Sequence, residues 1–375
     1  LIHNRKGSIE KMRAWLEIDM DNLKYNLNKI KELVQGTNVL GVIKANSYGF
    51  GAIETAKELS KNGVEIFGVA SLEEAMELRE GGIEEEILIL GSLFNDEIEI
   101  AAEKNFQITI SSMRQIEFLE SNKINAEIHI KIDTGMGRLG FTPEKGKKAV
   151  DYCIEKGIKV VGIYSHLSDA DGMSDEAYNY TKEQINKFKI FEEYKNIKYI
   201  HILNSGGILR FNDGFKGNLV RAGICMYGML GNERIPGFKR VFTMKTRILF
   251  IRTLEEDSYI SYGRTVKLKE GETFATLAIG YADGMKKEFS NKTYALIEGE
   301  KCPIVGEICM DMCMVKIPES ILKKINIGTE AIVIRDDIIE EINSVHKSTW
   351  DILTGIGRRV YRVYKKNGTP YLITR

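Results

Sequence analysis

The stretch Val39-Leu-Gly-Val-Ile-Lys-Ala-Asn-Ser-Tyr-Gly-Phe-Gly51 joins an apolar run to a single lysine and a loop of small residues. Strand-favouring residues through Ile43 predict a buried strand that would bring Lys44 out at the C-terminal edge of a sheet. Gly49 and Gly51 would let the chain turn sharply into a helix. Burial lowers the pKa of a lysine, and an amine with a lowered pKa can form a Schiff base with a carbonyl cofactor. A surface lysine at a strand end is the alternative.

The same alternation of apolar runs and amphipathic segments continues as far as residue 226, and the segment Ser71–Glu80 opens with a capping box. Parallel strands need connections of this length, and eight such units close a (β/α)8, TIM-type barrel. An open doubly wound sheet is the alternative, but the chain lacks a Gly-x-Gly-x-x-Gly turn after the first strand. The strands are predicted at Val39–Ile43, Ile66–Val69, Ile87–Leu90, Phe106–Ile110, Ile128–Ile132, Val160–Tyr164, Tyr199–Leu203 and Leu219–Met226.

Beyond Leu230 the pattern changes to short strands separated by turn residues, which is typical of a mostly β domain. We therefore predict an α/β fold with two domains, a barrel domain at 14–236 and a C-terminal β domain at 237–375. Residues 1–13 are polar and are interpreted as a cloning remnant or as the linker left by removal of an upstream region. The β-domain strands are predicted at Thr243–Arg252, Glu272–Ile279, Thr293–Ile297, Cys302–Val305, Cys309–Ile317 and Glu330–Ile334.

Composition and charge exclude several classes of protein. Lys+Arg and Asp+Glu both total 53, so a net charge of zero gives no bulk attraction for nucleic acid. The five cysteines include no Cys-x-x-Cys pair, which argues against a disulfide framework or a metal site and favours a reducing, cytoplasmic location. We expect neither a membrane span nor a signal peptide, because no long apolar run is present.

Polar residues follow the C-terminal ends of the predicted strands, where barrel enzymes place their active residues. They combine amines, two arginines, an imidazole and a turn rich in Gly and Ser, and such turns can offer backbone N–H groups to a phosphate. A phosphorylated ligand with a carbonyl group beside an amine is predicted, and pyridoxal 5'-phosphate meets both demands. The residues are Lys44, Tyr48, Lys131, Asp133, Arg138, His166, the turn 204–207 and the segment 221–224.

Six motifs occur in a fixed order: Val-Ile-Lys-Ala-Asn-Ser-Tyr-Gly, Lys-Ile-Asp-Thr-Gly-Met-Gly-Arg-Leu-Gly, Val-Arg-Ala-Gly-Ile-Cys-Met-Tyr-Gly, Ser-Tyr-Gly-Arg-Thr, Ile-Gly-Tyr-Ala-Asp-Gly and Cys-Met-Asp. With them, the chain resembles the alanine racemases, pyridoxal-phosphate enzymes of fold type III, from Trp15 to Tyr364. The resemblance implies a barrel plus a β domain and a head-to-tail homodimer with shared active sites. It also implies that a small amino acid is the substrate and that D-alanine is made for peptidoglycan.

The resemblance assigns proton transfer to two residues. Lys44 would be the Schiff-base lysine and the base on one face of the cofactor, and Tyr262 of the partner subunit would act on the other face. Racemisation removes the α-proton from one face and returns a proton to the other, so two groups are expected. An ordinary tyrosine has a pKa of about 10 and is a poor base at neutral pH. Nearby cations would have to lower that pKa, and His166 and Arg264 are the candidates.

The resemblance also assigns the binding residues. Arg221 would face the ring nitrogen and donate a hydrogen bond without giving up a proton. Arg138 would bind the substrate carboxylate, and Lys131 would be carbamylated so that its negative charge steadies Arg138. The other assignments are Tyr48, His166, Ser205, Gly223 and Ile224 to the cofactor, Tyr281 to the approach to the site, and Met310 and Asp311 to the substrate from across the dimer. A structural ion pair for Arg221 or Lys131, a core position for Met310 and a plain strand position for Tyr262 are the alternatives.

Three residues depart from the family pattern, and one of them is Tyr361, which stands in place of a usual proline. Phe50 stands where the family usually has a histidine. Arg358 stands where the family places a tyrosine that contacts the cofactor phosphate and crowds the substrate side chain. An arginine there could hold the phosphate by a charge-assisted bond, or it could enlarge or charge the pocket. A serine racemase, such as the soluble domain of a serine/alanine racemase, or a racemase of acidic amino acids is therefore an alternative. A fold-type III decarboxylase and a non-enzymatic pyridoxal-phosphate-binding protein are less favoured.

Overall fold

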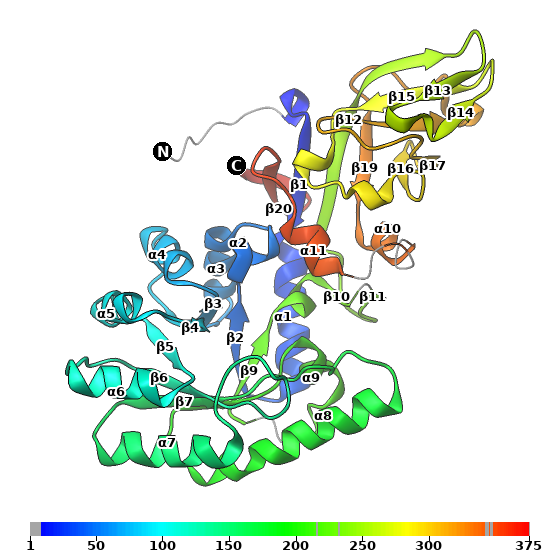
Figure 1. Cartoon of the computed structure of the whole chain (residues 1–375). Coiled ribbons are helices and arrows are strands. Elements are labelled where there is room, and N and C mark those ends of the chain that lie inside the picture. The colour runs from blue at the N-terminus through cyan, green and yellow to red at the C-terminus, as the bar shows by residue number, and fades with distance from the viewer. Residues whose placement is uncertain (1–8, 215–216, 232, 342–344, 346–347, 375) are drawn as a thin grey trace. The chain divides into compact units, whose positions relative to one another are not determined.

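The computed structural model (Figure 1) describes residues 9–214, 217–231, 233–341, 345 and 348–374. The chain divides into two compact units. Lys24–Ser47 and Gly51–Met226 form one unit, the barrel unit, and Leu1–Leu23, Tyr48–Phe50 and Tyr227–Arg375 form the other, the β unit. Residues 1–8 of the predicted N-terminal linker lie outside the described residues.

The barrel unit contains eight strands in the described part of the chain, and each neighbouring pair in the order β8-β7-β6-β5-β4-β3-β2-β9 is parallel. The backbone N–H of Arg221 in β9 donates to the carbonyl of Leu203, just beyond β8, at 2.9 Å, which closes the ring. Each predicted strand overlaps one of these strands, so the predicted barrel is confirmed. The strands are β2 (Asn38–Val42), β3 (Ile66–Val69), β4 (Glu86–Ser92), β5 (Gln107–Ile110), β6 (Ile128–Lys131), β7 (Val160–Tyr164), β8 (Tyr199–His201) and β9 (Leu219–Ala222).

Helices connect the strands and cover the outside of the barrel (Figure 1). Their starts follow the sequence: the Ser71 side chain accepts a hydrogen bond from the N–H of Glu74 at 3.4 Å, and Ser174 accepts one from Ala177 at 3.1 Å. Caps of this kind fix where a helix begins after the strand that precedes it. The helices of this region are α1 (Met20–Val34), α2 (Lys44–Tyr48), α3 (Ala52–Lys61), α4 (Leu72–Glu80), α5 (Asn95–Glu103), α6 (Met113–Ser121), α7 (Pro143–Glu155), α8 (Asp175–Phe188) and α9 (Ser205–Arg210).

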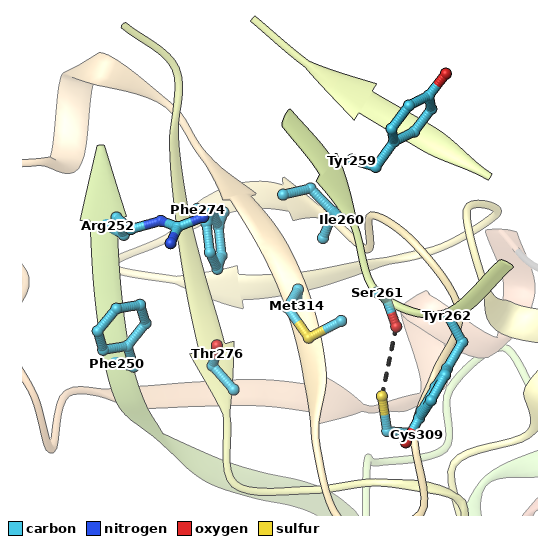
Figure 2. A pocket seen from close by; sticks show the side chains of 10 residues that line it. All are labelled: Phe250, Arg252, Tyr259, Ile260, Ser261, Tyr262, Phe274, Thr276, Cys309 and Met314. Atoms are coloured by element: carbon cyan, nitrogen blue, oxygen red, sulfur yellow. Dashed lines mark hydrogen bonds between the residues drawn. The ribbon is translucent and has the colours of Figure 1, made fainter. Parts of the chain in front are cut away.

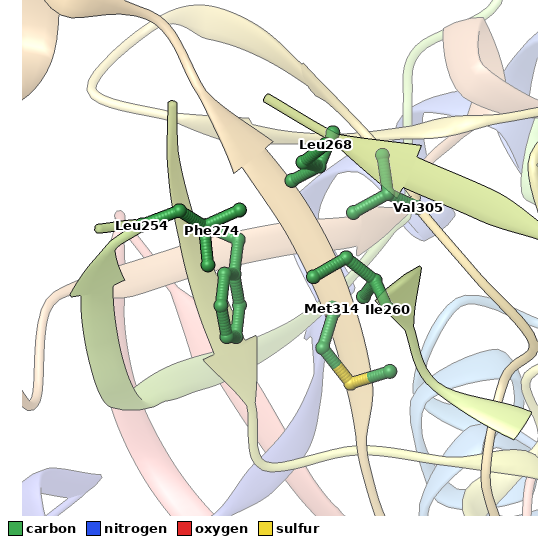
Figure 3. Close-up of a cluster of buried hydrophobic side chains, with 6 residues drawn as sticks. All are labelled: Leu254, Ile260, Leu268, Phe274, Val305 and Met314. Atoms are coloured by element: carbon green, nitrogen blue, oxygen red, sulfur yellow. The ribbon is translucent and has the colours of Figure 1, made fainter. Parts of the chain in front are cut away.

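The β unit contains a sheet of nine strands among the described residues. Its long strand β12 pairs with β1, β15 and β19, and alternate side chains of β12 are buried along its first half, as the pleat of a strand requires. Figure 3 shows one core cluster, formed by Leu254, Ile260, Leu268, Phe274, Val305 and Met314. The strands of the unit are β1 (Ala14–Asp19), β10 (Met229–Leu230), β11 (Glu233–Arg234), β12 (Phe242–Thr253), β13 (Ser258–Ile260), β14 (Val266–Leu268), β15 (Thr273–Leu277), β16 (Tyr294–Ile297), β17 (Glu300–Pro303), β18 (Cys313–Ile317), β19 (Glu330–Ile334), β20 (Tyr361–Lys366) and β21 (Thr369–Thr374), with helices α10 (Asp336–Glu341) and α11 (Thr349–Thr354).

Strand β1, which the sequence prediction groups with the barrel domain, lies in the sheet of the β unit. It is antiparallel to β12 and parallel to β20. Trp15 of β1 is fully buried and packs with Met12 and Val363. The run of apolar residues in β1 predicts a strand, but the choice of sheet depends on partners more than 200 residues away in sequence.

Candidate active site

Lys44 lies two residues beyond β2, at the C-terminal end of the barrel strands. The backbone before it is held in the sheet, because the N–H of Ile43 donates to the carbonyl of Gly68 at 3.0 Å. The amine is half-buried, and its pKa is lowered by burial and by the charges of Arg138 and Arg221. More of this amine is therefore unprotonated at neutral pH than in an exposed lysine, as a nucleophilic amine requires.

The backbone after Lys44 forms a left-handed turn. Four successive residues, from Ala45 to Tyr48, have φ angles between 51° and 57°. A left-handed conformation costs an L-residue roughly 1–2 kcal/mol and survives only where the surroundings hold it. One such contact is the hydrogen bond from the N–H of Gly51 to the carbonyl of Asn46 at 2.9 Å. Backbone strain is thus concentrated next to the half-buried amine.

Phe50 belongs to the β unit and is fully buried. Its ring stacks on Tyr227 with 4.2 Å between the ring centroids, and the buried Tyr48 meets the same ring edge-on at 5.9 Å. Gly49 has φ +88°, and a Cβ atom there would lie 2.5 Å from the carbonyl oxygen of Leu353. The position therefore requires glycine, and the predicted turn at Gly49 is present. At Phe50, an aromatic contact therefore stands where the sequence resemblance implies a histidine.

Arg221 is buried on β9, and its guanidinium has four acceptors. It donates to the carbonyls of Ser165 at 2.7 Å and Ile202 at 3.0 Å, and to the Nδ1 atoms of His201 at 3.0 Å and His166 at 3.1 Å. Burial lowers the pKa of Arg221 to about 10, which still leaves it protonated at neutral pH. Burial and the charge of Arg221 hold the pKa of His166 well below its usual value. This imidazole is therefore a neutral acceptor, and the prediction that it is a cation able to lower the pKa of Tyr262 is wrong.

Lys131 ends β6 with a buried amine that lies 4.9 Å from the ring centroid of Tyr164. Burial, together with the charges of Arg221 and Arg138, lowers the pKa of Lys131 to about 7. Arg138 is exposed in the loop that follows. This loop is shaped by Asp133, whose Oδ1 accepts hydrogen bonds from the N–H groups of residues 135 to 137 at 2.9–3.1 Å. An amine with a pKa near neutrality is thus held beside two arginines.

Ser205 begins α9, just beyond β8. Its buried hydroxyl accepts hydrogen bonds from the N–H groups of Gly223 at 3.2 Å and Cys225 at 3.3 Å, so the turn after β9 is tied to the turn after β8. Asn204 caps the same helix by accepting from the N–H of Gly207 at 3.0 Å. The turns that contain Ser205, Gly223 and Ile224, predicted to bind phosphate, are therefore side by side.

The barrel unit brings together Lys44, Lys131, Arg138 and Arg221, since each of the two lysines has its pKa lowered by both arginines. Positive charges gathered in a partly buried site repel one another, and an anionic ligand would relieve that repulsion. The arrangement is suited to bind a phosphate or a carboxylate beside a reactive amine.

Tyr262 lies in the β unit between β13 and β14, and 73% of it is exposed. Its turn is strained: Ser261 has φ 65° and ψ −168°, a region that suits glycine, and Arg264 has φ 51°. The Ser261 hydroxyl donates to the carbonyl of Glu307 at 2.5 Å and lies 3.4 Å from the sulfur of Cys309 (Figure 2). These contacts hold a turn that presents the phenol outward.

The remaining predicted site residues are also in the β unit. Tyr281, Met310 and Arg358 are exposed, and the backbone after Tyr281 donates to the carbonyl of Met310 at 3.0 Å, so these two lie together. Asp311 is half-buried, and its carboxylate accepts a hydrogen bond from Arg359 at 2.7 Å. Asp311 therefore forms an ion pair with Arg359, in addition to its predicted role in binding the substrate.

Sequence reasoning missed the buried imidazoles behind Arg221. His129 and His201 are fully buried, with 3.1 Å between Nδ1 of His129 and Nε2 of His201. A signal was available: in Ile-His-Ile-Lys, His129 alternates with Lys131 and so points to the same face of the strand.

Within the described residues, no helix has the length and apolar character needed to cross a membrane. Over the same residues, no group of three or more His, Cys, Asp or Glu side chains is placed to hold a metal ion. All five cysteines are free thiols.

Comparison with known proteins gives one consistent result. Residues 18–231 match the family model of the alanine racemase N-terminal domain, and residues 241–364 match that of the C-terminal domain. An alanine racemase of Fusobacterium nucleatum is 49% identical over 352 residues, covering 94% of this chain and 99% of the relative. A solved alanine racemase of Clostridium difficile 630 superposes with a TM-score of 0.88 at 34% identity, covering 97% and 98% of the two chains. One of Bacillus anthracis, solved with bound L-Ala-P, gives 0.85 at 28% identity over 97% of each chain. This chain belongs to the alanine racemase family.

Proposed function

We propose that this chain interconverts L- and D-alanine with pyridoxal 5'-phosphate as its cofactor. Membership of the alanine racemase family makes it a racemase and therefore an isomerase. The observation that best supports the proposal is the half-buried amine of Lys44, whose pKa is lowered by burial and by two arginines. Such an amine can bind an aldehyde and can exchange a proton at neutral pH.

The donor groups at this end of the barrel fit pyridoxal phosphate. Lys44 would hold the aldehyde carbon, and Arg221 would donate to the ring nitrogen. Ser205 and the backbone N–H groups of Gly223 and Ile224 suit a phosphate, because N–H groups at turns and helix starts bind anions. The N–H of Gly223, which donates to the Ser205 hydroxyl in the structure, would share its hydrogen with the phosphate. Tyr48, His166 and Arg358 join this set on the strength of the family resemblance.

When bound, pyridoxal phosphate supplies an electron-withdrawing ring that makes the α-proton of the attached amino acid acidic. Lys44 would move that proton on one face, and Tyr262 of the partner subunit would move it on the other. Arg138 would hold the substrate carboxylate, which guanidinium groups bind by paired hydrogen bonds. Because Arg221 keeps its own proton, it would orient the ring without protonating it, and this favours prompt return of the α-proton over other reactions.

A homodimer with shared sites is supported by the surface around Tyr262. This residue lines an open groove of about 520 Å³ together with Phe250, Tyr259 and seven other residues (Figure 2). Phe250, Tyr259 and Tyr262 are all exposed although aromatic. Exposed aromatic side chains around a groove are typical of protein–protein contacts, and we propose that a second copy of the chain covers this one.

Mixing two inactive variants tests the shared site. Lys44→Ala and Tyr262→Phe chains would each be inactive alone, but a mixed dimer with sites built from both subunits has one complete site. Random mixing should restore about a quarter of the activity, since about half of the dimers are mixed and each has one working site of two. Mixed dimers that stay inactive would show that each site is built within one chain.

We further propose that Lys131 is carbamylated. Its pKa of about 7 leaves much of the amine neutral at neutral pH, and a neutral amine reacts with carbon dioxide. The carbamate would carry a negative charge beside Arg138 and would steady that guanidinium.

Alanine is the proposed substrate, and serine is the alternative because Arg358 replaces the family's tyrosine. The test is to incubate the holoenzyme with L-alanine in deuterated water and to measure α-proton exchange and D-alanine formation, with serine and the acidic amino acids in parallel. We expect alanine to turn over fastest and Lys44→Ala or Tyr262→Phe to slow it at least ~100-fold. Preferred turnover of serine would revise the substrate, release of carbon dioxide would indicate a decarboxylase, and absence of exchange would indicate a binding protein.

A further inference from the structure

A continuous chain of hydrogen bonds runs through the barrel interior from Arg221 to Glu86. Nη1 of Arg221 lies 3.0 Å from Nδ1 of His201, and Nε2 of His201 lies 3.1 Å from Nδ1 of His129. Nε2 of His129 lies 2.8 Å from Oε1 of Gln107, whose Nε2 donates to Oε2 of Glu86 at 2.7 Å and to Oε2 of Glu127 at 3.2 Å. Glu86 and Gln107 are the first residues of their strands, so the chain leads from the candidate active site to the opposite end of the barrel.

The chemistry of the two ends fixes the direction of every hydrogen in this chain. The amide oxygen of Gln107 can only accept, so Nε2 of His129 carries a hydrogen and its Nδ1 accepts. Nε2 of His201 must then donate to His129, which leaves Nδ1 of His201 as the acceptor for Arg221. Both imidazoles are neutral Nε2–H tautomers, and burial supports this by lowering the pKa of His129 to about 3 and that of His201 well below its usual value.

Packing around the chain leaves little freedom for another arrangement. His129, His201, Gln107 and Arg221 are all buried. A Cβ atom at Gly162 would lie 2.0 Å from Nδ1 of His129, so that ring fills the space over a glycine. At the far end, burial raises the pKa of Glu86, but hydrogen bonds from Lys198, Tyr199 and Gln107 outweigh it and lower that pKa. Glu86 is therefore the anionic end of a chain whose other end is a guanidinium.

We propose that Gln107 and Glu86 are positioning residues that act on Arg221 through the two imidazoles. By fixing both tautomers, they keep the unprotonated Nδ1 of His201 facing the guanidinium of Arg221. The opposite tautomers would set two N–H groups against each other and push Arg221 away from its place. The proposal rests on the proposed function, in which Arg221 meets the cofactor ring, and it adds residues at the far end of the barrel to the control of that contact.

The tautomers can be measured directly. In holoenzyme labelled with [¹⁵N]histidine, side-chain nitrogen spectra should show hydrogen on Nε2 of both His129 and His201, unchanged from pH 6 to pH 9. Gln107→Leu removes the acceptor for His129 and should change the nitrogen resonances of both imidazoles. Tyr199→Phe is the matched control, because it removes another hydrogen bond to Oε2 of Glu86 and leaves the chain itself intact.

Kinetics supply the second readout. For Gln107→Leu we expect kcat for alanine to fall about tenfold with KM within twofold of wild type, because Arg221 would act on the cofactor ring rather than on the substrate. Tyr199→Phe should leave both constants within twofold. If Gln107→Leu does not fold, replacing both Glu86 and Glu127 by leucine removes the two carboxylates that accept from the Gln107 amide. This double variant should change the same resonances, with Lys198→Met as its control.

Two results would overturn the proposal: hydrogen on Nδ1 of His201 in the wild type, or resonances and kcat of Gln107→Leu that match those of Tyr199→Phe. The failure of the proposed function would look different. In that case the wild-type protein would lack racemase activity with every amino acid, whereas the tautomer measurement would still decide whether the chain of hydrogen bonds exists.

Discussion

Replacing Ala45 by glycine should stabilise this protein, although the same substitution weakens an ordinary helix. Ala45 is exposed at φ 53° and ψ 50°, and its N–H bond to Glu74 at 2.6 Å survives the change. The left-handed conformation costs alanine roughly 1–2 kcal/mol that glycine avoids. Glycine also adds roughly 0.5–1 kcal/mol of conformational entropy to the unfolded chain. The difference is an expected gain of about 0.5–1 kcal/mol in the free energy of unfolding.

The matched control is Ala102→Gly, in the last turn of the right-handed helix α5. There the alanine is unstrained, so glycine should cost about 0.5 kcal/mol. Urea denaturation of the two variants and the wild type, at equal cofactor load, should give shifts of opposite sign. If both variants lose stability to the same extent, the backbone after Lys44 is not left-handed in solution, and the strain argument for this site is wrong.

Carbamylation of Lys131 should depend on pH around its pKa of about 7, which lies below the ordinary lysine value. The neutral fraction of the amine rises from about one tenth at pH 6 to about nine tenths at pH 8. The ¹³C NMR signal of the carbamate, formed from ¹³C-bicarbonate, should therefore grow over that pH range. The signal should be absent in Lys131→Met. Phe50→His should lower the free energy of unfolding by about 2 kcal/mol, because it places a polar ring against Tyr227. Phe50→Leu keeps an apolar side chain there and should lower the free energy of unfolding by less. Equal midpoints of the two variants in urea denaturation would contradict this prediction. Gly162→Ala should cost about 3 kcal/mol in urea denaturation, because its Cβ meets His129; a tolerated alanine would mean that the imidazole can move.

The sequence predicts the features of this fold that depend on local pattern. Apolar runs of strand length and capped amphipathic helices locate the eight barrel strands, and strand ends locate Lys44 and Arg221. Features that depend on residues far away in the sequence cannot be predicted from a local pattern. The sheet that takes up β1 is set by β12 and β20, and the tautomer of His129 is set by Gln107 on the next strand. The left-handed turn that begins at Ala45 is also hidden, because three of its four residues are types that favour other conformations.

The charges at the C-terminal end of the barrel serve two requirements at once. Arg138 and Arg221 lower the pKa of Lys44 and so leave its amine free to react, and they also attract an anionic ligand. A carboxylate built into the site beside Arg138 would satisfy that arginine but would raise the pKa of the amine again. A carbamate on Lys131 would place a negative charge beside Arg138 only while carbon dioxide is bound to that amine. Without carbon dioxide, Lys131 would remain an amine. The balance between an activated amine and a steadied arginine would then be set by a reversible modification, and Arg221, which is held by neutral acceptors, would keep its charge in both states.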